Sequence, residues 1–86
     1  MRVRIPSPLH AYTAGASEAQ ADGDTLEALL ADLDHQYPGL RFRIVDEQTR
    51  LRPHIRVFVD GRLVSGLDRT LTSTSEVMIV CALSGG

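Results

Sequence analysis

One amphipathic helix is the strongest pattern in this chain, and it limits what the remaining segments can form. Leucines recur three and four residues apart from Leu26 to Leu33, and Tyr37 follows one turn later. This spacing places the apolar side chains on one face of a helix and leaves the other face polar. A helix with one apolar face, in a chain of 86 residues, predicts a single helix packed on a single sheet.

The ends of this helix have their own signals. Asp24 is a residue type that caps helix N-termini, and Glu27 three residues later completes a capping-box pattern. Pro38-Gly39 is expected to end the helix.

The segments before the helix predict two strands. Val3 and Ile5 alternate with arginines in a first strand that Pro6 stops, and residues 17–21 alternate again as a second strand. Between them, Leu9 is expected to fold back as an apolar plug and residues 10–15 to form a loop.

The segments after the helix predict further strands. Apolar and arginine residues alternate over 40–44, which indicates a strand, and residues 46–49 form a polar turn. Residues 55–59 and 62–64 flank Asp60-Gly61, a dipeptide that tolerates positive φ and marks a tight hairpin. A connection with two plug leucines (66–71) and a polar turn (72–75) lead to a last strand at 76–82.

This order of elements predicts an α+β fold in which one main helix crosses a mixed sheet of four or five strands. The last strand closes the sheet by lying parallel to the first, and both are central. We expect a single domain over residues 1–83 followed by a flexible tail, Ser-Gly-Gly, at 84–86.

Composition excludes several classes of protein. The net charge of −2 does not suggest a nucleic-acid binder, and no segment approaches membrane-spanning length, so a cytoplasmic protein is expected. All nine basic residues are arginine. The single cysteine, Cys81, cannot form an intrachain disulfide and fits a reducing compartment.

The last four residues, Leu83-Ser84-Gly85-Gly86, offer a different kind of chemistry. Glycine has no Cβ, so a Gly-Gly end can lie extended in a channel too narrow for side chains. The α-carboxylate of Gly86 is then the only reactive group that the tail presents.

The ordered set of these features resembles the ubiquitin-like, β-grasp sulfur carriers. That family includes the small subunit of molybdopterin synthase, the thiamine sulfur carrier and the carrier of a cysteine-forming pathway. The matching pieces are the opening strand Val3 to Pro6, the helix start Gly23 to Leu26, the hairpin Val57 to Gly61, and Gly85-Gly86.

The resemblance implies a carrier and not an enzyme. An E1-like adenylating enzyme would use ATP to convert the carboxylate of Gly86 into an acyl-adenylate, because a carboxylate alone is a poor electrophile. Sulfur from a persulfide or a sulfurtransferase would replace AMP and leave a thiocarboxylate, which a client enzyme accepts. Leu83, Ser84 and Gly85 would thread the partner's channel. The chain has no phosphate-binding glycine loop, so no intrinsic cofactor is expected.

Two departures from the family pattern affect the choice of pathway. Thr74-Ser75-Glu76 stands where members often have Asp-Gly-Asp, and Val80 to Ser84 lacks the aromatic and proline residues of the molybdopterin subunit. Cysteine or another sulfur metabolite is therefore favoured. The alternatives are a molybdopterin synthase subunit, a protein modifier conjugated through Gly86, and a binding module with an inert tail.

Other residues that suggest chemistry have simpler interpretations. Cys81 shares the inward face of the last strand, which favours core filling over a persulfide shuttle. His10, His35 and His54 have no metal-ligand spacing, so no metal is expected. The arginines from Arg41 to Arg69 indicate a solvated face, or alternatively a surface that steers an acidic partner.

Strand parity predicts where partners dock. Successive side chains of a strand alternate between faces, so Phe58, Met78 and Val80 should point away from the helix. Three large apolar side chains on an uncovered sheet face suggest a protein interface. The alternative is that the loop from Arg50 to His54 folds over them.

Overall fold

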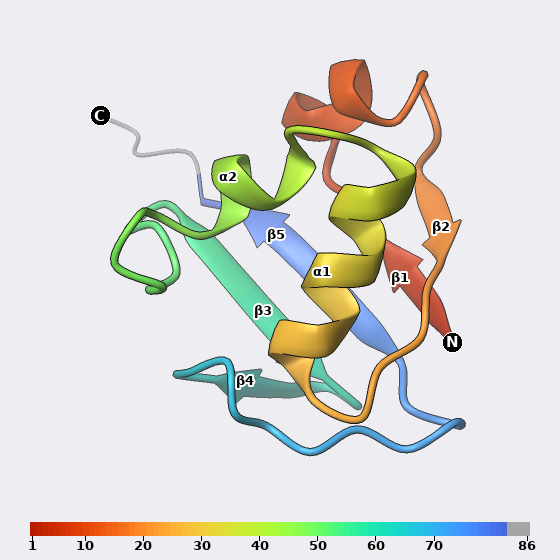
Figure 1. The fold of residues 1–86 in the computed structure, drawn as a ribbon, viewed down its shortest axis with the longest axis vertical. Helices are drawn as coiled ribbons and strands as arrows, with labels where there is room; N and C mark the ends of the chain where they lie inside the picture. The colour runs from red at the N-terminus through yellow and green to blue at the C-terminus, as the bar shows by residue number, and fades with distance from the viewer. Residues whose placement is uncertain (83–86) are drawn as a thin grey trace.

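The computed structural model describes residues 1–82, which form a five-stranded sheet with helices over one of its faces (Figure 1). The elements in chain order are β1 (Arg2–Arg4), the 3-10 helix η1 (Ser7–Tyr12), β2 (Glu18–Gln20), α1 (Leu26–Gln36), α2 (Leu40–Ile44), β3 (Ile55–Val59), β4 (Arg62–Val64) and β5 (Val77–Cys81). No helix within this described part of the chain is both long and apolar enough to cross a membrane.

The sheet has the strand order β2-β1-β5-β3-β4. β1 runs parallel to β5, with Val3 opposite Val77, and all other neighbours are antiparallel. The predicted closure of the sheet by its first and last strands is therefore confirmed. β5 is the central strand, hydrogen-bonded on both edges.

The face of the sheet beneath α1 forms the core. The four leucines of the α1 stripe have no exposed surface, and Val57, Ile79 and Val3 meet them from the central strands. Leu9, Leu67 and Leu71 close the rim of this core as plugs, as predicted. The alternation of apolar residues in the strands therefore predicted correctly which side chains face the core.

The predicted cap of α1 is wrong by one residue. Thr25, not Asp24, is the N-cap, and its Oγ1 accepts a hydrogen bond from the amide of Ala28 at 3.2 Å. The Asp24 carbonyl instead accepts from the amide of Leu71 at 2.8 Å, so the chain is still tied to the 66–71 connection there. Glu27 completes no capping box, and its own amide donates to the Leu67 carbonyl.

Gly23 lets the chain approach α1 closely. A Cβ at this position would lie 2.4 Å from the amide nitrogen of Leu29 and 2.8 Å from the carbonyl carbon of Ala28. Both atoms belong to helix backbone, which cannot move aside without distorting the first turn. The resemblance of residues 23–26 to the family's helix start thus has a steric cause.

The strand predicted at 40–44 is wrong, because this segment is the short helix α2. Gly39 has φ 96°, which turns the chain after α1, and the Asp34 carboxylate accepts from the amides of Gly39 and Arg41. Leu40 and Ile44 are both fully buried. Apolar residues at i and i+4 suit a helix as well as a strand, and the turn at Gly39 selects the helix.

The predicted loop at 10–15 is also partly wrong, since η1 extends to Tyr12. The hairpin is confirmed: β3 and β4 pair through Asp60 (φ 51°) and Gly61 (φ 81°), which is a two-residue turn with two positive φ angles. The Asp60 carboxylate also accepts from the amide of Glu76 at 2.9 Å, which ties the turn to the start of β5.

Candidate functional site

Two surfaces flank the C-terminal end of β5. One is the sheet face opposite α1, which we call the outer face. The other is a groove on the helix side, beside α2. The four predicted tail residues, Leu83, Ser84, Gly85 and Gly86, lie outside the described residues.

The outer face contains the three side chains that strand parity predicted. Val57, Val59, Val77 and Ile79 are buried beneath α1, while Phe58 and Val80 are half-buried and Met78 is 40% exposed. Phe58 lies directly opposite Met78 across β3 and β5. The structure thus places Phe58, Met78 and Val80 on one face.

Sequence reasoning missed a fourth residue of this face. Leu63 is 58% exposed and lies opposite Phe58 on β4, so an apolar row runs across three strands. Beside it, a hollow of about 260 Å³ is lined by Arg4, Glu76 and Met78 among others. The pairing register of the two-residue hairpin was the signal that could have identified Leu63.

The loop from Arg50 to His54 does not fold over the outer face. The Arg52 amide donates to the Ile44 carbonyl, and Arg52 Nε donates to the Phe42 carbonyl at 2.7 Å. The loop is therefore held against α2, on the helix side. Nothing among the described loop residues shields Phe58 or Met78 as that alternative required.

The loop before Arg52 is organised by one carboxylate. Asp46 accepts from the amides of Gln48 and Arg50 at 2.9 and 3.0 Å. The Arg50 amide is the main cause of a lowered pKa at Asp46, and the Gln48 amide and the nearby guanidinium groups add to it. Because the charged form is favoured, this turn keeps its hydrogen bonds at neutral pH.

Cys81 is half-buried at the end of β5 and packs against the core edge. Burial raises the pKa of its thiol. A thiol with a raised pKa is a weaker nucleophile at neutral pH, because less of it is thiolate. This environment favours core filling over a persulfide shuttle.

One histidine and several charged groups have local partners. His10 Nε2 lies 2.9 Å from the Ile5 carbonyl, and within residues 1–82 no group of histidine, cysteine and carboxylate side chains could hold a metal ion. Arg41 lies 3.7 Å from Glu27. Of the arginines in the 41–69 stretch, Arg41 and Arg50 lie beside carboxylates, while Arg43 and Arg52 line the groove.

The comparison with known proteins decides the family. The ThiS family model matches residues 3–86. The chain belongs to the ThiS family. This ThiS-family chain is 33% identical to the sulfur carrier protein CysO of Mycobacterium tuberculosis over 89 aligned positions, which cover 98% of this chain and 96% of that protein.

Solved structures agree with this assignment. The crystal structure of the Amycolatopsis orientalis BexX/CysO complex contains a chain that superposes with a TM-score of 0.91 at 28% identity, covering 99% of this chain and 98% of the other. The small archaeal modifier protein 1 of Methanosarcina acetivorans superposes with a TM-score of 0.79 at 26% identity, covering 99% and 94%. The predicted β-grasp fold is confirmed, and the similarity to CysO supports a sulfur-carrier role.

Proposed function

We propose that this ThiS-family chain carries sulfur as a thiocarboxylate on Gly86 and donates it to a client enzyme in cysteine formation. The observation that supports this most is full-length similarity to CysO, with the family match reaching residue 86. The chain acts as a co-substrate, and catalysis belongs to its partners.

The chemistry proceeds in two stages. The Gly86 carboxylate attacks the α-phosphorus of ATP in a partner's site, which forms an acyl-adenylate and releases pyrophosphate. A persulfide then attacks the acyl carbon and AMP leaves. A second thiol cleaves the resulting S–S bond, which yields the thiocarboxylate and a disulfide. If the donor is sulfide, the thiocarboxylate forms directly and no reductant is needed.

The fold suits this role because β5 delivers the tail from the centre of the sheet. Its hydrogen bonds to both β1 and β3 hold the strand in one position, and the Ala82 amide donates to the His54 carbonyl at 2.7 Å. Gly86 is four positions beyond Ala82, so it lies within about 14 Å of Ala82 by the maximum reach of an extended chain. A partner that acts on Gly86 must therefore approach the end of β5 closely.

The outer face is the proposed docking surface for the adenylating enzyme and the client. Phe58, Met78 and Leu63 form an apolar row in which Met78 and Leu63 are exposed and Phe58 is half-buried. Val80 extends this row along β5 toward the tail. The BexX/CysO complex shows that a similar chain has a protein partner, which supports this assignment.

A second candidate function is protein modification through Gly86. The similarity to small archaeal modifier protein 1 favours it, and activation of the carboxylate would be shared with sulfur transfer. The two functions differ in what attacks the activated carbonyl: sulfur in one case and a lysine amine in the other. The chain itself has no lysine, so it cannot form lysine-linked polymers of itself.

The experiment is an intact-mass measurement of the protein incubated with an adenylating enzyme, ATP and a sulfur donor. We expect a mass change equal to the replacement of one oxygen by one sulfur, and fragmentation should place it on Gly86. Deletion of Gly86 should abolish the change and leave the thermal melt unaltered. An unmodified mass under turnover conditions, or modification of the deleted protein, would refute the sulfur-carrier proposal. Adducts to lysines of added proteins would favour the modifier.

A further inference from the structure

A groove of about 580 Å³ lies on the helix side of the end of β5. We call it the Arg-aromatic groove, after lining residues that come from four separate segments of the chain: Tyr12, Phe42, Arg43, Arg52, His54 and Ala82. We infer that this groove is a second docking surface, which takes an acidic segment of the enzyme that acts on Gly86. The inference rests on the proposed function for the identity of that enzyme.

The two guanidinium groups of the groove are held in place by aromatic rings. The Arg43 guanidinium carbon lies 5.0 Å from the centre of the Tyr12 ring, and that of Arg52 lies 4.6 Å from the centre of the Phe42 ring. Arg52 Nε also donates to the Phe42 carbonyl. A planar guanidinium held in this way loses little side-chain entropy when it binds a carboxylate.

The charge of the groove has one sign. No aspartate or glutamate lines it, and within residues 1–82 neither Arg43 nor Arg52 takes part in an ion pair. By contrast, Arg41 and Arg50, on the same stretch of chain, each have a carboxylate within 4.0 Å. The two groove arginines therefore have hydrogen-bond donors free for carboxylates from outside the described chain.

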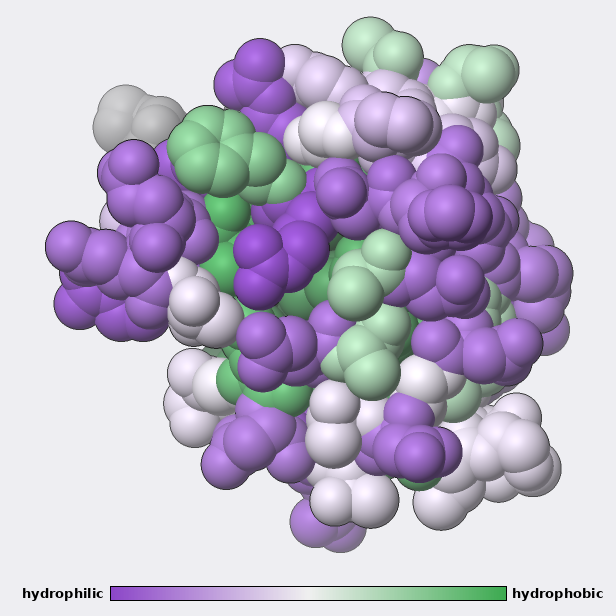
Figure 2. Space-filling view, in the orientation of Figure 1, coloured by the Kyte–Doolittle hydropathy of each residue, from purple (hydrophilic) through white to green (hydrophobic). Residues whose placement is uncertain are grey.

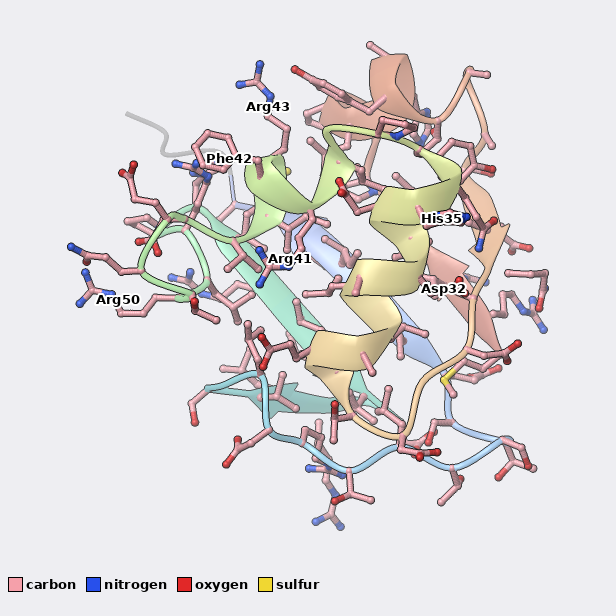
Figure 3. The ribbon with its side chains drawn as sticks, viewed as in Figure 1. Asp32, His35, Arg41, Phe42, Arg43 and Arg50 are labelled. Carbon is pink, nitrogen blue, oxygen red and sulfur yellow. The ribbon has the colours of Figure 1, made fainter. Side chains whose placement is uncertain are left out.

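The groove also offers apolar contact. Phe42 is 53% exposed, and apolar side chains reach the surface beside α2 (Figure 2). Figure 3 shows Phe42 and Arg43 projecting from α2 at the same end of the molecule. Leu9 and Cys81 complete the apolar part of the lining. A segment in which acidic and apolar side chains alternate matches both features.

The position of the groove explains why the occupant should belong to the tail's own enzyme. Ala82 lines the groove, and Gly86 lies within about 14 Å of it by chain reach. An enzyme that encloses Gly86 must cover the end of β5, so its surface meets the groove on one side and the outer face on the other. Carboxylates at that point would fix the orientation of the docked carrier.

The first test needs no partner enzyme. Protein labelled with ¹⁵N is titrated with a peptide of alternating glutamate and leucine, and with a matched peptide of glutamine and leucine. We expect amide shifts confined to the groove, centred on Arg43, Arg52 and His54, with the glutamate peptide only. The double variant Arg43→Gln/Arg52→Gln should lose them, and the exposed Arg62→Gln on β4 should keep them.

Two results of this titration would overturn the inference. Equal shifts with the glutamine peptide would show that charge is not recognised. Shifts of the same amides with AMP or inorganic phosphate, but not with the glutamate peptide, would assign the groove to a phosphate and not to a protein segment.

The second test uses thiocarboxylate formation by the adenylating enzyme. The double variant should raise KM for the carrier about tenfold with kcat nearly unchanged, because the groove binds at a distance from the reacting carbonyl. Arg43→Lys/Arg52→Lys should recover part of the loss, and Arg62→Gln should match the wild type. An unchanged KM in a folded double variant would refute the groove alone. Failure of the wild-type protein to form any thiocarboxylate would instead refute the proposed function, and the peptide titration would still decide the groove.

Discussion

The outer face and the Arg-aromatic groove lie on opposite sides of one strand end, yet they are built in different ways. The outer face is a row of apolar side chains set by the cross-strand pairs Met78–Phe58 and Phe58–Leu63. The groove joins side chains from η1, α2 and the loop after it, such as Tyr12, Phe42 and Arg52. Regular sheet geometry thus makes one surface, and tertiary packing makes the other.

This difference predicts different contributions to partner recognition. Burial of apolar area on the outer face acts only at contact and depends weakly on salt. Arginines act over about 10 Å in 0.1 M salt and mainly guide approach and orientation. We therefore expect the outer face to set most of the affinity and the groove to set how the carrier is oriented.

The largest effect should follow a charge placed on the outer face. Phe58→Glu should weaken binding to the adenylating enzyme at least about 30-fold, as expected for a central aromatic anchor, when measured by calorimetry. The thermal melt should change little, since the side chain is only half-buried. Ala31→Glu adds the same charge on the exposed face of α1 and should bind normally. Unfolding of Phe58→Glu would instead show that this side chain belongs to the core.

A smaller effect should separate the two surfaces by their dependence on salt. Between about 0.05 and 0.5 M NaCl, wild-type affinity should fall about tenfold, because the groove arginines are screened. Arg43→Gln/Arg52→Gln should be weaker at low salt and nearly flat across the series. Phe58→Ala should be weaker throughout but keep the wild-type slope. Equal slopes for all three proteins would contradict the division of roles.

Cys81 borders the groove, so its substitution checks whether a thiol is needed there. Cys81→Ala should cost about 1 kcal/mol of unfolding free energy, a small loss typical of a partly buried side chain, and leave sulfur transfer unchanged. Rates are compared at equal folded fraction. Loss of transfer in the folded variant would show that the thiol takes part.

Because burial raises the pKa of Cys81, alkylation of the wild-type thiol at neutral pH should also be slower than that of a free cysteine.

The smallest effect should be a pH dependence of amide exchange, confined to the turn at residues 46–50. The lowered pKa of Asp46 means that its hydrogen bonds stabilise the turn fully above the ordinary aspartate value of about 3.9, and are lost as pH falls through the lowered pKa. Amide exchange at Gln48 and Arg50 should therefore increase in that acidic range, relative to the hairpin turn. Asp46→Asn should show the weakened protection already at neutral pH. Equal protection from amide exchange in the wild type and in Asp46→Asn would show that the Asp46 carboxylate does not stabilise the turn.

The sequence predicted the fold correctly where the spacing of apolar residues fits only one type of secondary structure. The α1 stripe and the alternation of β3 and β5 identify buried faces, because one face of each element must meet the core. The outer positions Phe58, Met78 and Val80 followed from the same parity. Leu63 was missed only because the hairpin register was not extended to β4.

The predictions were wrong where the local sequence pattern fits more than one structure and contacts with distant residues determine which one forms. Leu40 and Ile44 satisfy both a strand and a helix, and the turn at Gly39 with the Asp34 carboxylate selects the helix. The Asp24 cap failed because its carbonyl pairs with Leu71, far along the chain. The groove was not predicted for the same reason, since Tyr12 and Phe42 are separated by 30 positions and meet only after folding.

The most direct measurement compares the whole protein with its detached end. Residues 77–86 are made as a peptide, and adenylation of the peptide and of the folded chain is followed by pyrophosphate release under identical conditions. If the domain serves to present Gly86, the peptide's kcat/KM should be lower by about 1,000-fold or more, equivalent to about 4 kcal/mol of recognition by the two surfaces. Adenylation of the peptide as efficiently as the folded protein would contradict that role for the fold.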